Sequence, residues 1–485
     1  MKNTKFLLIV PLALGITACS DDSDDDNKNN ELTVPTTYSF ASVFVDGADS
    51  VAYDGQTMRH VLISDLTSRI KSLTESDSPG EVISAMDFFF RFDDGVGGDL
   101  PYSFTVRDAN DDPVSLAQGP NYEDISTGKN LVGKIAGRDP ALINGEFFGW
   151  TQGMDSNPTP EELADYFFAQ LDAIATDDNT DQIDITGGSA FIDKPYISVT
   201  GLDYSQLIQK FLLGAVAFSQ GVGDYLATDY SADNSDPRDG ESYSDLQHLW
   251  DEAFGYFGAA RDYNDYTDDE LSGASGRVEY ANGYHDSNGD GNIDLYAEYN
   301  FGNSANCAKR DRASVDATNF TKEAFDAFLK GRAILNEGVT LSGEKLDEFN
   351  EARLTASVTW EKCIAATVIH YINKVVADID AFDGDVYADL DAFKAHAKHW
   401  GEMKGFALGL QFNPDSPFRA DTASLNNLKQ VLSLMGDAPV LPDGTQNGVA
   451  FSGGANQYRA DLITVRNILR DAYEFSANNA ENWGS

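Results

Sequence analysis

The feature that most constrains the fold is a segment that is apolar on every side of a helix. Cys363–Ile372 has this character and lies within a longer helical pattern, 342–379. A helix without a polar face is stable only when other helices surround it. Six further helical patterns follow residue 200, namely 203–227, 243–262, 320–336, 386–411, 422–436 and 455–477. The sequence therefore predicts a mainly α protein with a helical-bundle domain over residues 201–480.

Residues 33–200 are predicted to form a loop-rich N-terminal region with helices. Helical patterns cover Gln56–Thr74 and Gly80–Phe92, and a third begins at the capped start Thr159-Pro160-Glu161-Glu162. A stretch rich in Gly, Asp and Pro precedes that third helix. The polar segment Asp177–Thr200 contains a Gly-Gly pair and is interpreted as a loop.

The first residues resemble a bacterial export signal. Residues 1–18 have a lysine-containing start and an apolar stretch, Phe6–Ile16, that is too short to span a bilayer. Ile16-Thr17-Ala18-Cys19 resembles the motif in which the cysteine becomes lipidated. An ordinary signal peptide with a chance cysteine is the alternative. Residues 19–32 are polar and acidic, which predicts a disordered tether. We therefore expect an outer-membrane lipoprotein anchored through Cys19, on the periplasmic face or the cell surface.

The chain is strongly acidic, with 79 Asp and Glu residues against 34 Lys and Arg and a formal net charge of −45. This charge argues against nucleic acid and anionic lipid surfaces as partners. It is compatible with divalent cations and with solubility in a salty medium.

The chain has three cysteines, one of which is the expected lipidation site. Cys307 and Cys363 are then the only possible disulfide pair. An oxidising compartment would let them bridge if their geometry allows.

An acidic loop at residues 285–298 has the spacing of a calcium site. Counted from Asp286, oxygen-bearing side chains recur at positions one, three, five and nine, with Gly at six and Ile at eight. Alternate oxygens suit a hard cation, and the isoleucine would pin the loop to a core. Position twelve is Ala297, so the loop departs from a standard EF-hand. The predicted Ca²⁺ ligands are Asp286, Asn288, Asp290, Asn292, Asp294 and Glu298, and the alternative is an acidic turn in an acidic protein.

Four of the six histidines lie in the predicted bundle helices. One of these helices places two carboxylates about a turn from a histidine. Another carries two histidines on its apolar face, with a glutamate about 60° away on the helix. Buried imidazoles need partners, which a metal or a facing carboxylate would supply. The candidate ligands for iron or zinc are His248, Asp251, Glu252, His370, His396, His399 and Glu402; a structural polar core is the alternative.

No catalytic motif supports an enzyme. Gly128–Ile135 imitates a phosphate loop but has Ile135 where a hydroxyl must reach Mg²⁺, and His-Glu-x-x-His is absent from the sequence. The sequence therefore favours a non-enzymatic protein.

Three stretches, Ser50–Arg59, His248–Phe257 and His399–Phe406, resemble a family of uncharacterised Gram-negative lipoproteins defined only as a domain of unknown function. The resemblance covers most of residues 35–475. Members are often encoded beside imelysin-like proteins, which implies metal acquisition at the envelope and an imelysin-like or transport partner. Imelysin-like proteins carry Gly-x-His-x-x-Glu, where this chain has Leu246 for the Gly and Asp251 for the Glu.

Three functions are consistent with these features. The first is a membrane-tethered envelope lipoprotein that binds or hands on a metal, with iron preferred. The second is a calcium-stabilised binding or scaffold module for an envelope protein or glycan. The third, an imelysin-like metallopeptidase, has no supporting motif.

Overall fold

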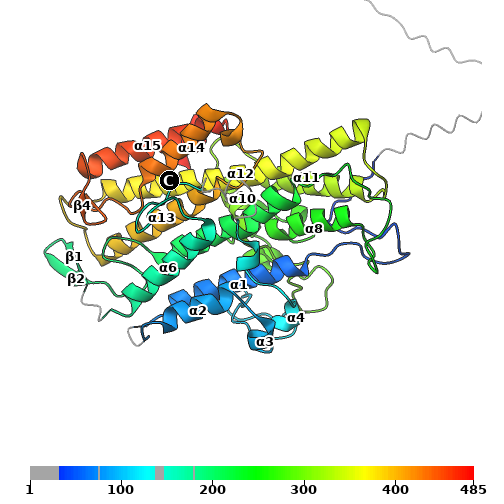
Figure 1. Ribbon diagram of the computed structural model, residues 1–485, viewed down its shortest axis with the longest axis horizontal. Helices are drawn as coiled ribbons and strands as arrows, with labels where there is room; N and C mark the ends of the chain where they lie inside the picture. Colours follow the sequence, from blue (N-terminus) through cyan, green and yellow to red (C-terminus); the bar gives the residue numbers. More distant parts are fainter. Residues whose placement is uncertain (1–31, 75–76, 137–146, 178–180, 485) are drawn as a thin grey trace, which may run out of the picture. The chain divides into compact units, whose positions relative to one another are not determined.

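The computed structural model describes residues 32–74, 77–136, 147–177 and 181–484. Val34–Ser485 form one compact unit (Figure 1). Its architecture is mainly α, which confirms the predicted fold class. The expected signal peptide and Cys19 lie outside the described residues. Over the described part of the chain, no helix combines the length and the apolar composition needed to cross a bilayer.

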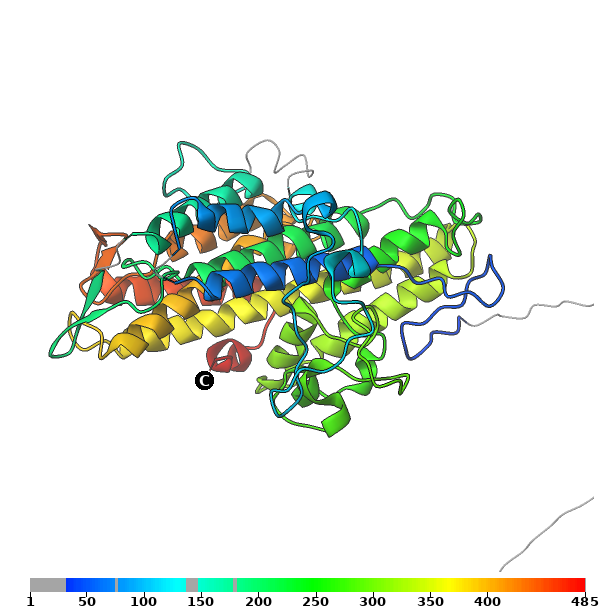
Figure 2. The ribbon, with the colours of Figure 1, turned by 90° about the horizontal axis from the view of Figure 1, so that it is seen from below.

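The core is built around the long helix α12 (Gly343–Asp380), which packs against α10 (Gly302–Arg312), α11 (Phe320–Leu335) and α13 (Leu390–Gly409). Figures 1 and 2 show α12, in yellow, lying beside α11 and α13. Every side chain from Cys363 to Ile369 is at most 3% exposed. The segment is therefore buried from Cys363 to Ile369 and at Ile372, whereas His370 and Tyr371 are partly exposed.

The remaining long helices follow the predicted patterns closely. Thr159 and Glu162 form the expected capping box at the start of α6. The bounds are α1 (Asp54–Lys71), α2 (Glu81–Phe90), α6 (Pro160–Ala175), α7 (Tyr204–Leu212), α8 (Asp245–Phe257), α14 (Thr422–Met435) and α15 (Gly454–Ala472). The pattern 203–227 continues beyond α7 as two π-helical segments, η2 (Leu213–Phe218) and η3 (Gly221–Tyr225), because apolar periodicity predicts a helix but not its hydrogen-bond spacing.

Short elements complete the unit. The short α-helices are α3 (Asp94–Gly97), α4 (Tyr122–Ile125), α9 (Asp268–Leu271) and α16 (Ala477–Asn482). The 3₁₀ turns are η1 (Val132–Lys134), η4 (Tyr263–Asp265), η5 (Val278–Gly283) and η6 (Pro417–Arg419). A small hairpin near the C-terminus joins β3 (Thr445–Gln446) to β4 (Val449–Ala450).

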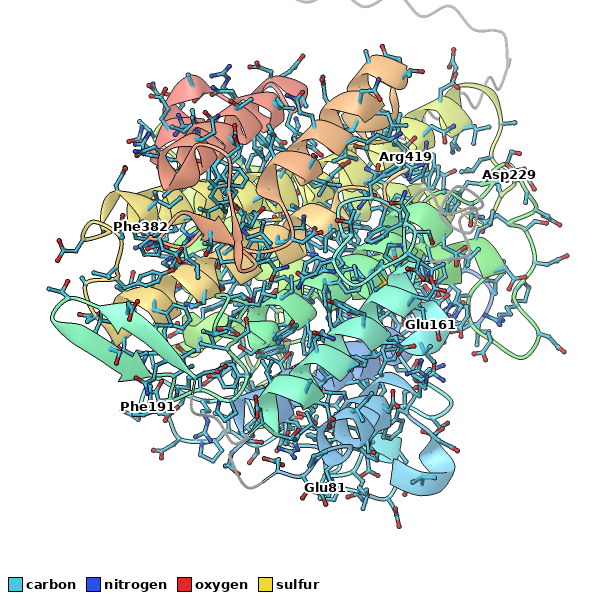
Figure 3. The ribbon with its side chains drawn as sticks, turned by 60° about the vertical axis from the view of Figure 1, so that its left-hand side comes forward. Glu81, Glu161, Phe191, Asp229, Phe382 and Arg419 are labelled. Atoms are coloured by element: carbon cyan, nitrogen blue, oxygen red, sulfur yellow. A yellow bond between two sulfur atoms is a disulfide. The ribbon has the colours of Figure 1, made fainter. Side chains whose placement is uncertain are left out.

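The interpretation of Asp177–Thr200 as a loop is wrong. It contains an antiparallel hairpin of β1 (Gln182–Ile185) and β2 (Gly188–Phe191), turned at Gly187 with a φ of 86°. Isoleucines from this segment form a small core with Tyr387, Phe393 and Ala397. Figure 3 labels Phe191 on the hairpin, where its side chain is 60% exposed. The hairpin is therefore stabilised by distant residues, which local polarity does not reveal.

Candidate functional site

The acidic loop is wound by its own side chains. The Asp286 carboxylate accepts hydrogen bonds from the backbone N–H groups of Gly289, Asp290 and Gly291 at 2.7, 3.2 and 2.9 Å. Asn288 Oδ1 accepts from Asp290 N at 2.8 Å. Gly291, at position six, has a φ of 86°, a conformation that glycine adopts without strain. The sharp turn that calcium loops need is therefore present.

Glu298 holds the two ends of this loop together. It is 1% exposed. Its Oε1 accepts from Ser287 N and Oγ at 2.8 and 2.7 Å, and its Oε2 accepts from Asp294 N at 3.0 Å. Both oxygens are thus engaged with the loop. Asn288 and Asp290 lie on the exposed side of the loop.

Ile293, at position eight, ties the loop to the N-terminal region. It is 4% exposed, donates from its N–H to Ser115 O at 2.9 Å and accepts from Ala117 N at 2.9 Å. Gln118 Nε2 also donates to Asp294 Oδ1 at 2.7 Å. The acidic loop therefore links residues 115–118 to the part of the chain that leads into α10.

His248 and Glu252 lie together on α8. His248 Nε2 is 3.8 Å from Glu252 Oε2, and Gln56 Nε2 donates to Glu252 Oε1 at 2.8 Å. The imidazole stacks on Tyr243 with ring centroids 4.9 Å apart. Within the described chain, the buried Nδ1 of His248 has no hydrogen-bond partner. This pair is the part of the predicted α8 site that the fold keeps together.

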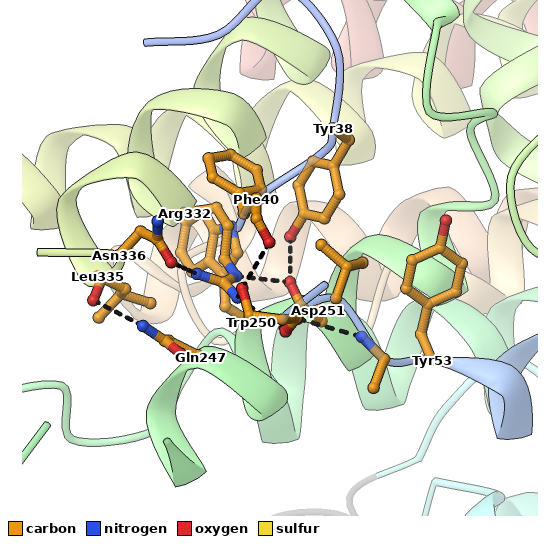
Figure 4. A network of polar contacts seen from close by, with 12 residues as sticks. Tyr38, Phe40, Tyr53, Gln247, Trp250, Asp251, Arg332, Leu335 and Asn336 are labelled. Atoms are coloured by element: carbon orange, nitrogen blue, oxygen red, sulfur yellow. Dashed lines mark hydrogen bonds and ion pairs between the residues drawn. The ribbon is translucent and has the colours of Figure 1, made fainter. Parts of the chain in front are cut away.

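Asp251 does not join that pair, although it is only three residues from His248. Its carboxylate is fully buried and accepts from Tyr38 OH at 2.7 Å and from Arg332 Nε at 2.8 Å (Figure 4). Arg332 Nη2 also donates to Ser50 O at 2.9 Å. Asp251 thus fastens the N-terminal segment to α8 and α11.

His370, His399 and Glu402 gather around Tyr371. Tyr371 OH donates to Glu402 Oε1 at 2.9 Å, and its ring centroid is 4.8 Å from that of His370 and 6.4 Å from that of His399. His399 Nδ1 lies 2.7 Å from Asp378 Oδ2. Burial, with the nearby charge of Arg310, lowers the pKa of His370 to about 3, so its imidazole is neutral.

His396, which also belongs to α13, lies in a different environment. It is fully buried, and its Nδ1 lies 2.8 Å from Tyr387 OH. Burial lowers its pKa to about 4. Its Nε2 is buried and lacks a hydrogen-bond partner over the described ranges.

The predicted transition-metal residues therefore lie in separate places rather than in one centre. In the part of the chain that the structure describes, no three His, Cys, Asp or Glu side chains are placed to hold a metal together. Cys307 and Cys363 are joined by a disulfide with a Cα–Cα distance of 4.8 Å, which links α10 to α12.

Sequence reasoning missed a buried carboxylate on α12. Glu361 is fully buried and accepts from Asn413 Nδ2, Ser416 Oγ and Tyr473 OH at 2.7, 2.6 and 2.7 Å. Burial raises its pKa to about 7. The signal in the sequence that could have indicated this buried carboxylate is a glutamate two residues before the apolar segment Cys363–Ile372.

These observations define the class of the protein: a mainly α bundle protein with an acidic loop and several buried polar pairs. Residues 146–339 match a family model described as Domain of unknown function (DUF4856). The match confirms an uncharacterised domain family over α6 to α11, a narrower range than the sequence resemblance implied. It includes His248 and the acidic loop but not the residues around Tyr371. No curated protein and no solved structure shows significant similarity to the chain.

Proposed function

We propose that this protein is a membrane-tethered binding or scaffold protein for an envelope protein or glycan. It would be anchored through Cys19 and stabilised by Ca²⁺ in its acidic loop. The observation that carries the proposal is the loop itself. Asp286, Asn288 and Asp290 supply oxygens at alternate positions, and Gly291 makes the turn that such loops need. Ile293 connects the loop to residues 115–117, so a cation here would stabilise a contact between distant parts of the chain.

Calcium titration of the lipid-free protein, followed by calorimetry and thermal unfolding, tests the stabilisation by Ca²⁺. We expect binding and a higher unfolding temperature, both lost in the Asp286→Asn/Asp290→Asn variant. Asp108→Asn is the matched control, because Asp108 makes a similar turn with Asn110 N and Asp112 N outside the loop. Equal calcium responses in the wild type and the double variant would reject stabilisation through the acidic loop.

Fractionation of cells tests the tether. The wild-type chain is expected in the membrane fraction, and Cys19→Ser is expected to be released into the soluble fraction. Membrane association that survives this substitution would reject anchoring through Cys19.

Metal handling, alongside an imelysin-like or transport partner, is the second candidate function. Two buried imidazole nitrogens, His370 Nδ1 and His396 Nε2, have no protein hydrogen-bond partner among the described residues. Both imidazoles have lowered pKa values because they are buried, and neutral imidazole is the form that binds metals. This observation favours iron or zinc over a metal-free role.

Elemental analysis of protein purified without a tag or chelator separates the two functions. Near-stoichiometric iron or zinc that disappears in the His370→Ala/His396→Ala variant supports metal handling. His60→Gln is the control, because the His60 imidazole lies 3.2 Å from the Gly255 carbonyl oxygen and away from α13. Calcium without iron or zinc leaves the binding protein as the function.

A further inference from the structure

Positive side chains gather between α7, α10 and α13 in a chain dominated by acidic residues. We call these four residues the cationic cluster: Lys210, Lys309, Arg310 and Lys398. Lys210 Nζ lies 3.9 Å from Glu402 Oε1. Lys309 and Lys398 are near enough to act electrostatically on Lys210, and Arg310 and Lys398 are near enough to act on Lys309.

The disulfide lies next to the part of α10 that carries Arg310. Arg310 lies one turn beyond Cys307 on α10, and His370 lies two turns beyond Cys363 on α12. Residues at these spacings share a helix face, so the cross-link brings Arg310 and His370 to the same side of the α10–α12 contact. Trp483 Nε1 donates to Arg310 O at 3.2 Å, which fixes the end of α10.

Among the described residues, no acidic side chain forms an ion pair with Arg310. Its side chain belongs to a residue that is 6% exposed, and its Nε and Nη1 are buried without a hydrogen-bond acceptor among the residues described. A guanidinium stays charged at all physiological pH values, and a buried charge without a counter-ion is strongly unfavourable. An anion at this position would supply the missing acceptor.

The carboxylates nearby do not neutralise the cluster. Glu402 Oε1 accepts from Tyr371 OH and lies 3.9 Å from Lys210 Nζ, and Glu402 Oε2 is buried without a partner among the described residues. Asp378 is paired with His399. One free carboxylate therefore faces four cations. The remaining excess of positive charge attracts an anion. Planar oxyanions match the donor geometry of a guanidinium.

We propose that the cationic cluster binds an oxyanion group, a phosphate or a carboxylate, carried by a small ligand. Arg310 supplies the buried guanidinium at the base of the site. The exposed lysines Lys309 and Lys398 form its rim. This binding site is independent of the acidic loop and of the membrane anchor.

Calorimetry of the lipid-free protein tests the site at constant ionic strength and without added calcium, because calcium and phosphate precipitate together. Inorganic phosphate and glucuronate are titrated separately, with chloride as the reference anion, so that the preferred oxyanion is identified. We expect one of them to bind, and Lys309→Gln/Lys398→Gln to weaken that binding roughly tenfold or more. These two lysines are exposed, so the variant keeps its fold even if Arg310→Gln does not.

Lys322→Gln is the matched control, because Lys322 is an exposed helical lysine (56%) whose partner is Asp326 in the same helix. Its affinity for the anion should equal that of the wild type. Absence of binding by both anions, or equal affinity in the Lys309→Gln/Lys398→Gln variant and the wild type, would overturn the proposal.

Discussion

Arg332 and Asp251 form an ion pair in which neither side chain is exposed to solvent, with Nε 2.8 Å from Oδ1. The pair joins α11 to α8. The same guanidinium reaches Ser50 O and Oγ, and Tyr38 OH donates to the same Asp251 oxygen. One buried charge pair therefore holds three segments that are far apart in the sequence.

Replacing Asp251 by Asn should destabilise the protein by about 3–5 kcal/mol, because Arg332 would remain buried without its counter-ion. Urea unfolding followed by circular dichroism measures the change. Asp269→Asn is the control, since Asp269 and Arg312 form an ion pair with both side chains 51% exposed. Its removal should change stability by about 0–1 kcal/mol. Similar losses in the two variants would contradict a special role for the buried pair.

The disulfide should contribute strongly to stability because Cys307 and Cys363 are 56 residues apart. Closing a loop of that length restricts the unfolded chain and is worth about 4 kcal/mol in the chain-entropy model. We expect the free energy of unfolding of the Cys307→Ser/Cys363→Ser variant to be lower by about 4 kcal/mol, so that it unfolds at a lower denaturant concentration. Adding a reductant should lower the stability of the wild type and leave the variant unchanged; a reductant effect on both would point to another cause.

The sequence predicted most long helices because their apolar faces repeat along the chain, as in α12 and α15. It did not predict α10 (Gly302–Arg312), which is polar and contains residues with weak helix propensity. That helix is joined to α12 by the disulfide and packs against it. Elements that are stabilised by distant contacts cannot be predicted from the local sequence pattern.

The same distinction between local and distant contacts separates the candidate sites that the sequence predicted from those that it missed. The acidic loop was visible because its residues are consecutive and its spacing is fixed by the chemistry of a hard cation. The separation of Asp251 from His248 was not visible, since a helical projection cannot show that Arg332 of α11 approaches one side of α8. The cationic cluster was missed for the same reason, because its lysines and arginine come from three separate helices.

Replacing Glu298 by Gln should loosen the acidic loop. A glutamine has a single side-chain acceptor oxygen, so it cannot accept from both Ser287 N and Asp294 N. Leaving a buried amide without a partner costs about 1–3 kcal/mol. We expect faster amide hydrogen exchange at residues 286–294 and at Ala117, which bonds to Ile293 O. Glu344→Gln, at an exposed position of α12, should leave exchange in the loop unchanged. Unaltered hydrogen exchange in the loop of Glu298→Gln would show that the Glu298 carboxylate does not hold the acidic loop in shape.

Glu361 should make stability depend on pH. Burial raises its pKa to about 7 in the folded protein, above the ordinary value of 4.5 that it regains on unfolding. Between these two values the folded state binds more protons than the unfolded state, so stability must fall as pH rises. The contribution is complete below about pH 4.5 and is lost as pH passes through 7, with a total on the order of 3 kcal/mol. Unfolding free energies measured from pH 4.5 to 8 test this dependence.

Glu361→Gln isolates the effect, because other titrating groups are unchanged and cancel when the two pH profiles are subtracted. The hydroxyl groups of Ser416 and Tyr473 can rotate to accept from the new amide, so the variant can keep the buried contacts. The difference in stability between variant and wild type should then grow in the variant's favour as pH rises from 5 to about 8, the range in which a buried carboxyl with a raised pKa ionises. A constant difference across that range would mean that Glu361 is already ionised in the folded protein at pH 5. In that case the three hydrogen bonds to its carboxylate would outweigh the effect of its burial.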